Sequence, residues 1–195
     1  MSAAEYSFVQ DGDTLMLPFF NAASVKFRAG SFAVRTRYPY EGEVTVQVLA
    51  APKSGTAISF LKPSWSESFK LTVNSRSQPA MEQNGFVTYR GNLQAGDTLI
   101  YTFEQKPRWV PTHNRHTITD YQKVYLGPLL LAAEANGGKP LTLPNGAMMN
   151  WDAVKHCATL KGAKVLLCPI NDVIDWNYQI NTYNRQILWP QPGHP

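Results

Sequence analysis

A period-two alternation of apolar and polar residues constrains the fold of this chain more than any other feature. Phe32 and Val34 form the apolar side of one run, and Arg35 and Arg37 lie on its polar side. Three further runs alternate in the same way, at residues 44–48, 69–73 and 98–103. Because successive side chains of a strand point to opposite faces, the pattern predicts half-buried antiparallel strands.

Turn residues separate these runs about every ten residues. They occur at 38–42, 52–55, 84–85 and 95–97, where proline fixes φ and glycine supplies a positive φ. Short strands at this spacing predict an all-β fold, an antiparallel β-sandwich of jelly-roll type with two packed layers and little helix. The one helix signal is a short turn within 150–159, for which Asn150 would be the cap.

The pattern changes near Lys106, which predicts a boundary between two domains. Residues 106–120 contain two prolines and two histidines and show little alternation. We therefore expect a first β-sandwich over residues 1–106 and a second, smaller β-sandwich or sheet over residues 107–195. The strands expected in the second part cover 124–133, 163–168 and 178–188, and an irregular tail follows at 190–195.

Composition narrows the classes of function. The chain has 195 residues, 44% of them hydrophobic, which suffices for a core without metal or disulfide staples. The net charge is +4, but the basic residues are scattered singly, so no nucleic-acid partner is expected. The longest nearly apolar stretch, 126–133, is too short for a membrane helix. The first 14 residues show no export signal, so we expect a soluble cytoplasmic protein with no membrane partner.

The two cysteines exclude a closed zinc site made of thiolates, and no phosphate loop or dinucleotide motif is present. Neither a metal nor a cofactor is therefore expected. A hairpin with Gly162 and Ala163 as its loop would place Cys157 directly opposite Cys168, within reach of a disulfide. Because no export signal is visible, we expect two reduced thiols instead.

Acidic and histidine side chains supply only weak candidates for a ligand site. His113 begins an H-x-x-H, which does not converge on a metal when it lies on a strand or loop, so a solvated loop histidine is expected. Asp172 and Asp175 flank Trp176, an arrangement found in sugar sites and also in loops over a core tryptophan. No pair of carboxylates with a catalytic spacing can be assigned.

Aromatic residues are the other candidates, since their faces stack on the C–H faces of sugars. Most of the five tryptophans are expected in the core. Trp109 and Trp176 lie in polar contexts and are the surface candidates. The candidate ligand-binding set is therefore Trp109, Trp176, Asp172, Asp175 and His113.

A series of turn and strand motifs follows one another between about residues 15 and 134. In order they are Leu15-Met16-Leu17-Pro18-Phe19-Phe20, Tyr38-Pro39-Tyr40-Glu41-Gly42, Pro63-Ser64-Trp65, Leu71-Thr72-Val73-Asn74, Gly85-Phe86-Val87, Gly96-Asp97-Thr98 and Leu126-Gly127-Pro128. The series resembles the β-rich C-terminal region of the β-L-arabinofuranosidase-like glycoside hydrolases. Five positions depart from the family pattern: Leu61, Lys62, Ser75, Asn92 and Leu126. Among them, Ser75 stands where a turn glycine is usual.

The resemblance implies two β-sandwich layers and a glycan-related setting. In that family an N-terminal (α/α)6 barrel carries the reaction, with a cysteine nucleophile, acidic partners and a zinc site. No barrel-like sequence occurs here, so no catalytic residue carries over. The leading hypothesis is a non-catalytic accessory domain that packs on a catalytic domain or partner. The alternatives are a stand-alone carbohydrate-binding module, a hydrolase fragment or subunit, an enzyme in its own right, and a purely structural module.

Overall fold

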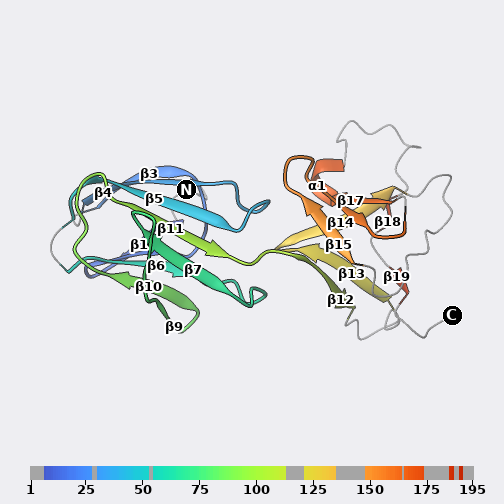
Figure 1. Ribbon diagram of the computed structural model, residues 1–195, viewed down its shortest axis with the longest axis horizontal. Coiled ribbons are helices and arrows are strands. Elements are labelled where there is room, and N and C mark those ends of the chain that lie inside the picture. Colours follow the sequence, from blue (N-terminus) through green and yellow to red (C-terminus); the bar gives the residue numbers. More distant parts are fainter. Residues whose placement is uncertain are drawn as a thin grey trace. The chain divides into compact units, whose positions relative to one another are not determined.

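The protein is described by a computed structural model in which two compact units follow each other along the chain, residues 1–104 and 105–195 (Figure 1). The division lies two residues before the boundary expected at 106. The structure describes residues 7–27, 30–52, 55–112, 121–134, 148–163, 165–173, 185–186 and 189–190. Among them no helix is both long and apolar enough to cross a membrane.

The first unit contains two β-sheets. One has the strand order β1-β2-β6-β10-β9, in which β2 and β6 are parallel and the other neighbours antiparallel. Its strands are β1 (Val9–Asp11), β2 (Thr14–Leu17), β6 (Ala57–Leu61), β9 (Met81–Gln83) and β10 (Phe86–Arg90). The other is antiparallel, with the order β3-β4-β5-β11-β7-β8. Its strands are β3 (Ala23–Phe27), β4 (Gly30–Thr36), β5 (Glu43–Ala50), β7 (Phe69–Val73), β8 (Arg76–Ser77) and β11 (Thr98–Phe103).

The predicted alternation forms the core of this unit. Val44, Val46 and Val48 of β5 are buried, and the residues between them are half-buried. Leu99, Tyr101 and Phe103 of β11 are buried in the same way. Side chains of both sheets join one hydrophobic cluster, so the sheets pack face to face. The all-β sandwich expected from the sequence is confirmed.

The second unit contains one further sheet, with the order β12-β13-β14-β17-β16-β15, while β18 pairs with β14 and β19 with β13. Its elements are β12 (Pro107–Pro111), β13 (Tyr121–Leu126), β14 (Leu129–Glu134), β15 (Met149–Asp152), β16 (Cys157–Leu160), β17 (Leu166–Pro169), α1 (Ile170–Val173), β18 (Arg185–Gln186) and β19 (Trp189–Pro190). Its core is a separate cluster that includes Val124, Leu131, Leu167 and Trp189.

Two expected elements of this unit are wrong. The single strand expected over 124–133 is a hairpin, because Gly127 takes a φ of 53° and reverses the chain between β13 and β14. The helical turn expected within 150–159 is also a hairpin, in which Asn150 pairs with Thr159. The strand expected over 178–188 lies largely outside the described residues.

The cysteines correct another expectation. Ala158 pairs with Leu167 and Thr159 with Leu166, the register that a Gly162-Ala163 loop predicts. Cys157 and Cys168 are therefore opposite each other, and they form a disulfide with a Cα–Cα distance of 4.3 Å. The expectation of two reduced thiols is wrong. The register of β16 and β17 brings the two cysteines within bonding distance, which is the physical reason for the bridge.

Replacing Ser75 with glycine is expected to stabilise the first unit by about 0.5–1 kcal/mol. Ser75 has a φ of 66° in the turn between β7 and β8, a conformation costing a non-glycine residue roughly 1–2 kcal/mol. Glycine relieves this strain but loses roughly 0.5–1 kcal/mol of backbone entropy, which leaves a net gain. The measurement is hydrogen exchange of peptides from β7 under mild denaturant. Ser77→Gly, at a position without a positive φ, is the matched control and is expected to destabilise.

An Asn74–Asp97 pair joins two of the turns that carry the family resemblance. Asn74 Nδ2 donates to Asp97 Oδ1 at 2.8 Å, and the Thr98 amide donates to Asn74 Oδ1 at 2.9 Å. The Gln94 amide donates to Asp97 Oδ2 at 2.7 Å. The Gln94 amide first, and Asn74 second, hold the pKa of Asp97 below its ordinary value of 3.8. The two turns are therefore tied together through one ionised carboxylate.

This pair predicts a pH dependence. Because the pKa of Asp97 is lowered in the folded state, its contribution is fully present above 3.8 and is lost as the pH falls through that value and below. Asp97→Asn should therefore flatten the loss of stability between pH 6 and pH 3, read as unfolding midpoints in urea. Asp11→Asn, which removes an exposed carboxylate from the end of β1, is the control. An unchanged slope in Asp97→Asn would contradict the assignment.

Candidate ligand-binding site

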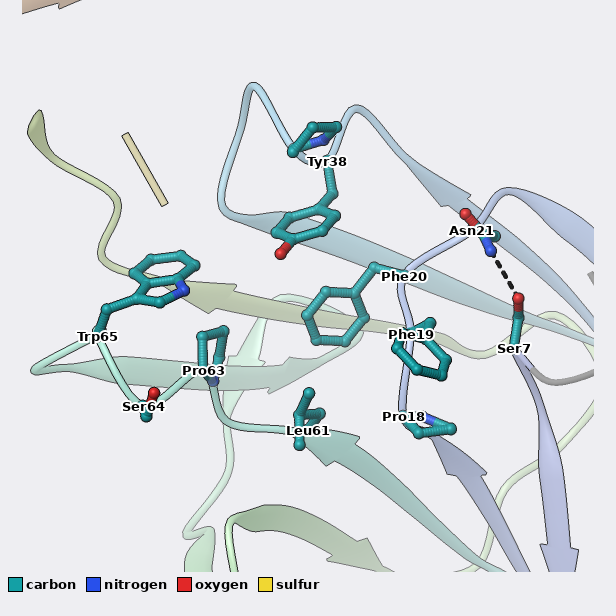
Figure 2. Close-up of a pocket in the computed structure, with 11 residues that line it drawn as sticks. Ser7, Pro18, Phe19, Phe20, Asn21, Tyr38, Leu61, Pro63, Ser64 and Trp65 are labelled. Carbon is teal, nitrogen blue, oxygen red and sulfur yellow. Dashed lines mark hydrogen bonds between the residues drawn. The ribbon is translucent and has the colours of Figure 1, made fainter. Parts of the chain in front are cut away.

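A cavity of about 630 Å³ opens at one end of the first unit (Figure 2). Four segments far apart in the sequence line it: the chain before β1, the chain after β2, the turn after β4, and the end of β6 with the turn that follows. The lining residues are Ser7, Pro18, Phe19, Phe20, Asn21, Tyr38, Pro39, Leu61, Pro63, Ser64 and Trp65. This volume lies within the roughly 300–1,000 Å³ typical of small-molecule sites.

The segment after β2 places one aromatic ring inward and one outward. Pro18 ends the strand because it cannot donate to the ladder. Phe20 is buried, and its ring packs edge-to-face on Tyr38 with 5.3 Å between the ring centroids. Phe19 has 60% of its surface exposed, an unusual fraction for a phenylalanine beside a cavity. The two neighbours thus supply a wall and a rim.

Tyr38 is held by the turn after β4. Its amide donates to Thr36 Oγ1 at 3.0 Å, and Thr36 Oγ1 donates to the Glu43 carbonyl at 2.7 Å. The amide of Tyr40 closes the turn on the Arg37 carbonyl at 2.9 Å. Burial raises the pKa of Tyr38 above its ordinary value of 10.0, so at neutral pH its hydroxyl keeps the proton and can donate it.

Trp65 is positioned by the turn after β6. The Ser66 amide donates to the Pro63 carbonyl at 3.0 Å, and the buried Ser66 Oγ donates to the Ser68 carbonyl at 3.0 Å. Both serine groups are therefore used to fix the turn. As a result, the indole of Trp65 stands against one side of the cavity.

Phe103 of β11 supports all three inner aromatic rings. Its ring centroid lies 5.3 Å from Phe20, 6.1 Å from Tyr38 and 5.8 Å from Trp65. Its backbone is fixed in turn, because the Phe103 amide donates to the Gly42 carbonyl at 2.9 Å. The cavity is therefore formed over a packed aromatic base, which favours a preformed site.

Polar groups lie at the edges of the cavity. Asn21 Nδ2 donates to Ser7 Oγ at one side, and the exposed Ser64 lies at the other. The hydroxyl of Tyr38 points into the space between Phe20 and Trp65 (Figure 2). None of the lining residues that the structure describes carries a charge. Such a site suits an uncharged ligand with apolar faces and a few hydrogen-bonding groups.

Of the residues proposed from the sequence, the structure describes Trp109 and Asp172, and neither lines this cavity. Trp109 lies on β12 of the second unit, where its ring packs edge-to-face on buried Trp189 at 5.9 Å. This contact favours a core role for Trp109. Asp172, on α1, approaches His156 with 3.7 Å between Oδ2 and Nδ1. His113, Asp175 and Trp176 lie outside the described residues.

Sequence reasoning missed the cavity, although its signal is visible. Each of the inner aromatic residues Phe20, Tyr38 and Trp65 is within two positions of a proline. The segments that contain these residues are motifs of the family resemblance, and as motifs they predict only the fold. Within the described part of the chain, no group of three or more His, Cys, Asp or Glu side chains gathers as a metal site would require.

The fold and this cavity define a two-unit β-rich module with a small-molecule-sized aromatic site. Residues 14–105 match the middle domain of beta-L-arabinofuranosidase, family GH127. The chain therefore contains a partial GH127-like region, as the order of its motifs predicted. No curated protein matches the chain.

Solved structures share the architecture. A GH127 beta-L-arabinofuranosidase from Geobacillus stearothermophilus T6 is 20% identical, with a TM-score of 0.63 over 76% of this chain and 25% of its own. A glycoside hydrolase is 18% identical, with a TM-score of 0.71 over 97% of this chain and 37% of its own. A GH127 beta-arabinofuranosidase is 15% identical, with a TM-score of 0.67 over 95% and 36%. The chain thus spans between a quarter and little more than a third of these proteins.

Proposed function

We propose that this chain is a non-catalytic accessory unit of a glycoside hydrolase, acting in a glycan-related setting and packing on a catalytic domain or partner. The observation that carries the proposal is the match of residues 14–105 to a domain described as the middle one of an arabinofuranosidase. A middle domain has neighbours in its own chain. Similar folds occur as 25–37% of larger proteins, which supports a role beside other domains.

The family resemblance also implies that catalysis and structural support belong to different domains. It assigns the reacting groups to an (α/α)6 barrel, and the β-rich region to a supporting part. A sandwich with a packed core offers a rigid surface on which such a barrel can be held. The chain is accordingly proposed to stabilise or orient a catalytic domain.

Association with a barrel tests this proposal. The full chain is mixed with the (α/α)6 domain of a GH127 arabinofuranosidase expressed without its own β-rich region. We expect co-elution in size-exclusion chromatography with light scattering, and a higher melting temperature of the barrel. The (α/α)6 domain of an unrelated glycosidase is the control. Separate elution of both pairs, with unchanged melting, would contradict the proposal.

The enzymatic alternative has its own test. The chain alone is expected to release no product from aryl arabinofuranosides. Hydrolysis that persists at constant specific activity through further purification would show that the chain is an enzyme and not an accessory unit.

A further inference from the structure

The cavity of the first unit joins apolar ring faces with hydroxyl and amide groups, and its described lining residues are all uncharged. A sugar ring has the complementary chemistry, because its C–H groups form apolar faces and its hydroxyl groups lie around the edge. Aromatic side chains meet such faces by stacking, and neighbouring polar groups fix the orientation. We propose that this cavity binds a neutral saccharide, an inference that rests on the glycan-related accessory function proposed above.

The walls supply the stacking surfaces. Trp65 and Tyr38 are half-buried, so part of each side chain stays accessible, whereas Phe20 is buried. Phe19, which is 60% exposed, extends the apolar surface to the rim of the cavity. A ligand that covers Phe19 removes apolar surface from water, which favours binding. The rings come from both ends of the cavity, so a chain of more than one sugar unit can contact them.

The polar groups are placed for the hydroxyl groups of a sugar. The Tyr38 hydroxyl points into the cavity (Figure 2) and, like any tyrosine hydroxyl at neutral pH, carries a proton that it can donate. The exposed Asn21 and Ser64 carry further amide and hydroxyl groups at opposite sides. The uncharged character of the described lining residues favours a neutral saccharide over a uronic acid, whose carboxylate would lose water without gaining a counter-charge from them.

The site is also held in shape before a ligand arrives. Phe103 packs against the rings of Phe20, Tyr38 and Trp65, and backbone hydrogen bonds fix the turns that carry Tyr38 and Trp65. A preformed site reduces the entropy lost on binding, since few side chains must be ordered.

Calorimetric titration of the full chain tests the inference. The probes are short arabino-, galacto- and xylo-oligosaccharides, with an oligogalacturonide as the anionic comparison. We expect saturable binding of at least one neutral series and none of the anionic one. Phe19→Ala should weaken binding about tenfold. Leu49→Ala removes another exposed apolar side chain of this unit, 49% exposed on β5 and outside the cavity, and should leave the affinity unchanged.

Two further variants separate stacking from folding. Tyr38→Phe removes only the hydroxyl and should weaken binding without altering the far-UV circular dichroism. Trp65→Ala should abolish binding, and Phe19→Ala keeps the test decisive if the loss of Trp65 impairs folding. Binding that survives both Phe19→Ala and Tyr38→Phe would overturn the assignment to this cavity.

The outcome is distinguishable from that of the accessory function. If no oligosaccharide gives a binding signal and Phe19→Ala instead prevents co-elution with the catalytic barrel, the cavity is a protein docking site. That result would overturn the saccharide site and support the accessory function. If a saccharide binds while no barrel associates, the site stands and packing on a barrel is rejected. Preference for the anionic oligosaccharide would overturn the neutral class of ligand.

Discussion

Gly42→Ala is expected to destabilise the first unit by about 3 kcal/mol, because there is no space for an additional carbon atom. A Cβ at this position would lie 2.2 Å from the carbonyl oxygen of Phe103 and 3.2 Å from its ring. The clash is with backbone, so a side-chain rotation cannot relieve it. Either the turn or β11 must move, and the hydrogen bond from the Phe103 amide to Gly42 is then strained or lost.

Hydrogen exchange measured by mass spectrometry provides the test, since it resolves the two units of the intact chain. Peptides from β5 and β11 should lose protection, whereas peptides from the second unit should not. Gly12→Ala is the matched control: Gly12 has a φ of 56° but nothing within 4 Å of a new Cβ, so only its backbone strain is felt. Equal effects of the two substitutions would contradict the steric explanation.

Gly42 also shows how far the conformation of turn residues can be predicted from the sequence. Glycines 55, 85 and 96 have the positive φ expected of turn glycines, with values of 89°, 77° and 95°. Gly42 lies in a turn with an equally clear signal, yet its φ is not among the positive ones. It is required for a close approach to β11, which comes some sixty residues later in the chain. A contact of that kind is not encoded in the local pattern.

Half-buried strands were predictable, and strands buried on both faces were not. β5 and β11 alternate because one face of each meets the core and the other meets water. In β6, four consecutive residues from Ala57 are buried, including Ser59, whose hydroxyl bonds to Thr88. Without a wet face there is no alternation to detect, and a buried serine gives no apolar signal.

The residues of the candidate site were also hard to predict, because local sequence does not show which side chains the fold brings together. Trp109 and Trp176 were selected because polar neighbours flank them, but such neighbours say little about where a ring points. Trp109 packs on Trp189 across strands far apart in the sequence. The rings of the cavity come from the chain near positions 20, 38 and 65 and meet only after the sheets pack. Because these rings come together only in the folded unit, the sequence motifs that contain them predict the fold but not the cavity.

The disulfide is relevant to the cellular compartment in which the protein is found. Disulfides persist in oxidising compartments and are rare in a reducing cytosol. The cytoplasmic expectation, drawn from the absence of an export signal, stays a prediction. Trapping of thiols in intact cells with an alkylating reagent tests it. Alkylation of both cysteines before lysis would agree with a reducing location, and protection of both would indicate an oxidising one.

Removing the Cys157–Cys168 bridge is expected to destabilise the second unit by roughly 3 kcal/mol, given the sequence separation of 11 residues. The bridge closes a short hairpin and limits the freedom of the unfolded chain. It joins β16 to β17, and both strands contribute core residues, Ala158 and Leu167 among them. The double variant Cys157→Ser, Cys168→Ser should therefore expose this part of the sheet to exchange.

The chain provides an internal control for this prediction, because both cysteines lie in the second unit. Dithiothreitol should lower the protection of peptides from β16 and β17 and leave those of β5 and β11 unchanged. In the double-serine variant the reductant should have no further effect. Alkylation of the unfolded protein without reductant gives the decisive result. Two modified cysteines would show that the bridge is absent, and none, followed by two after reduction, would establish that it fastens β16 to β17.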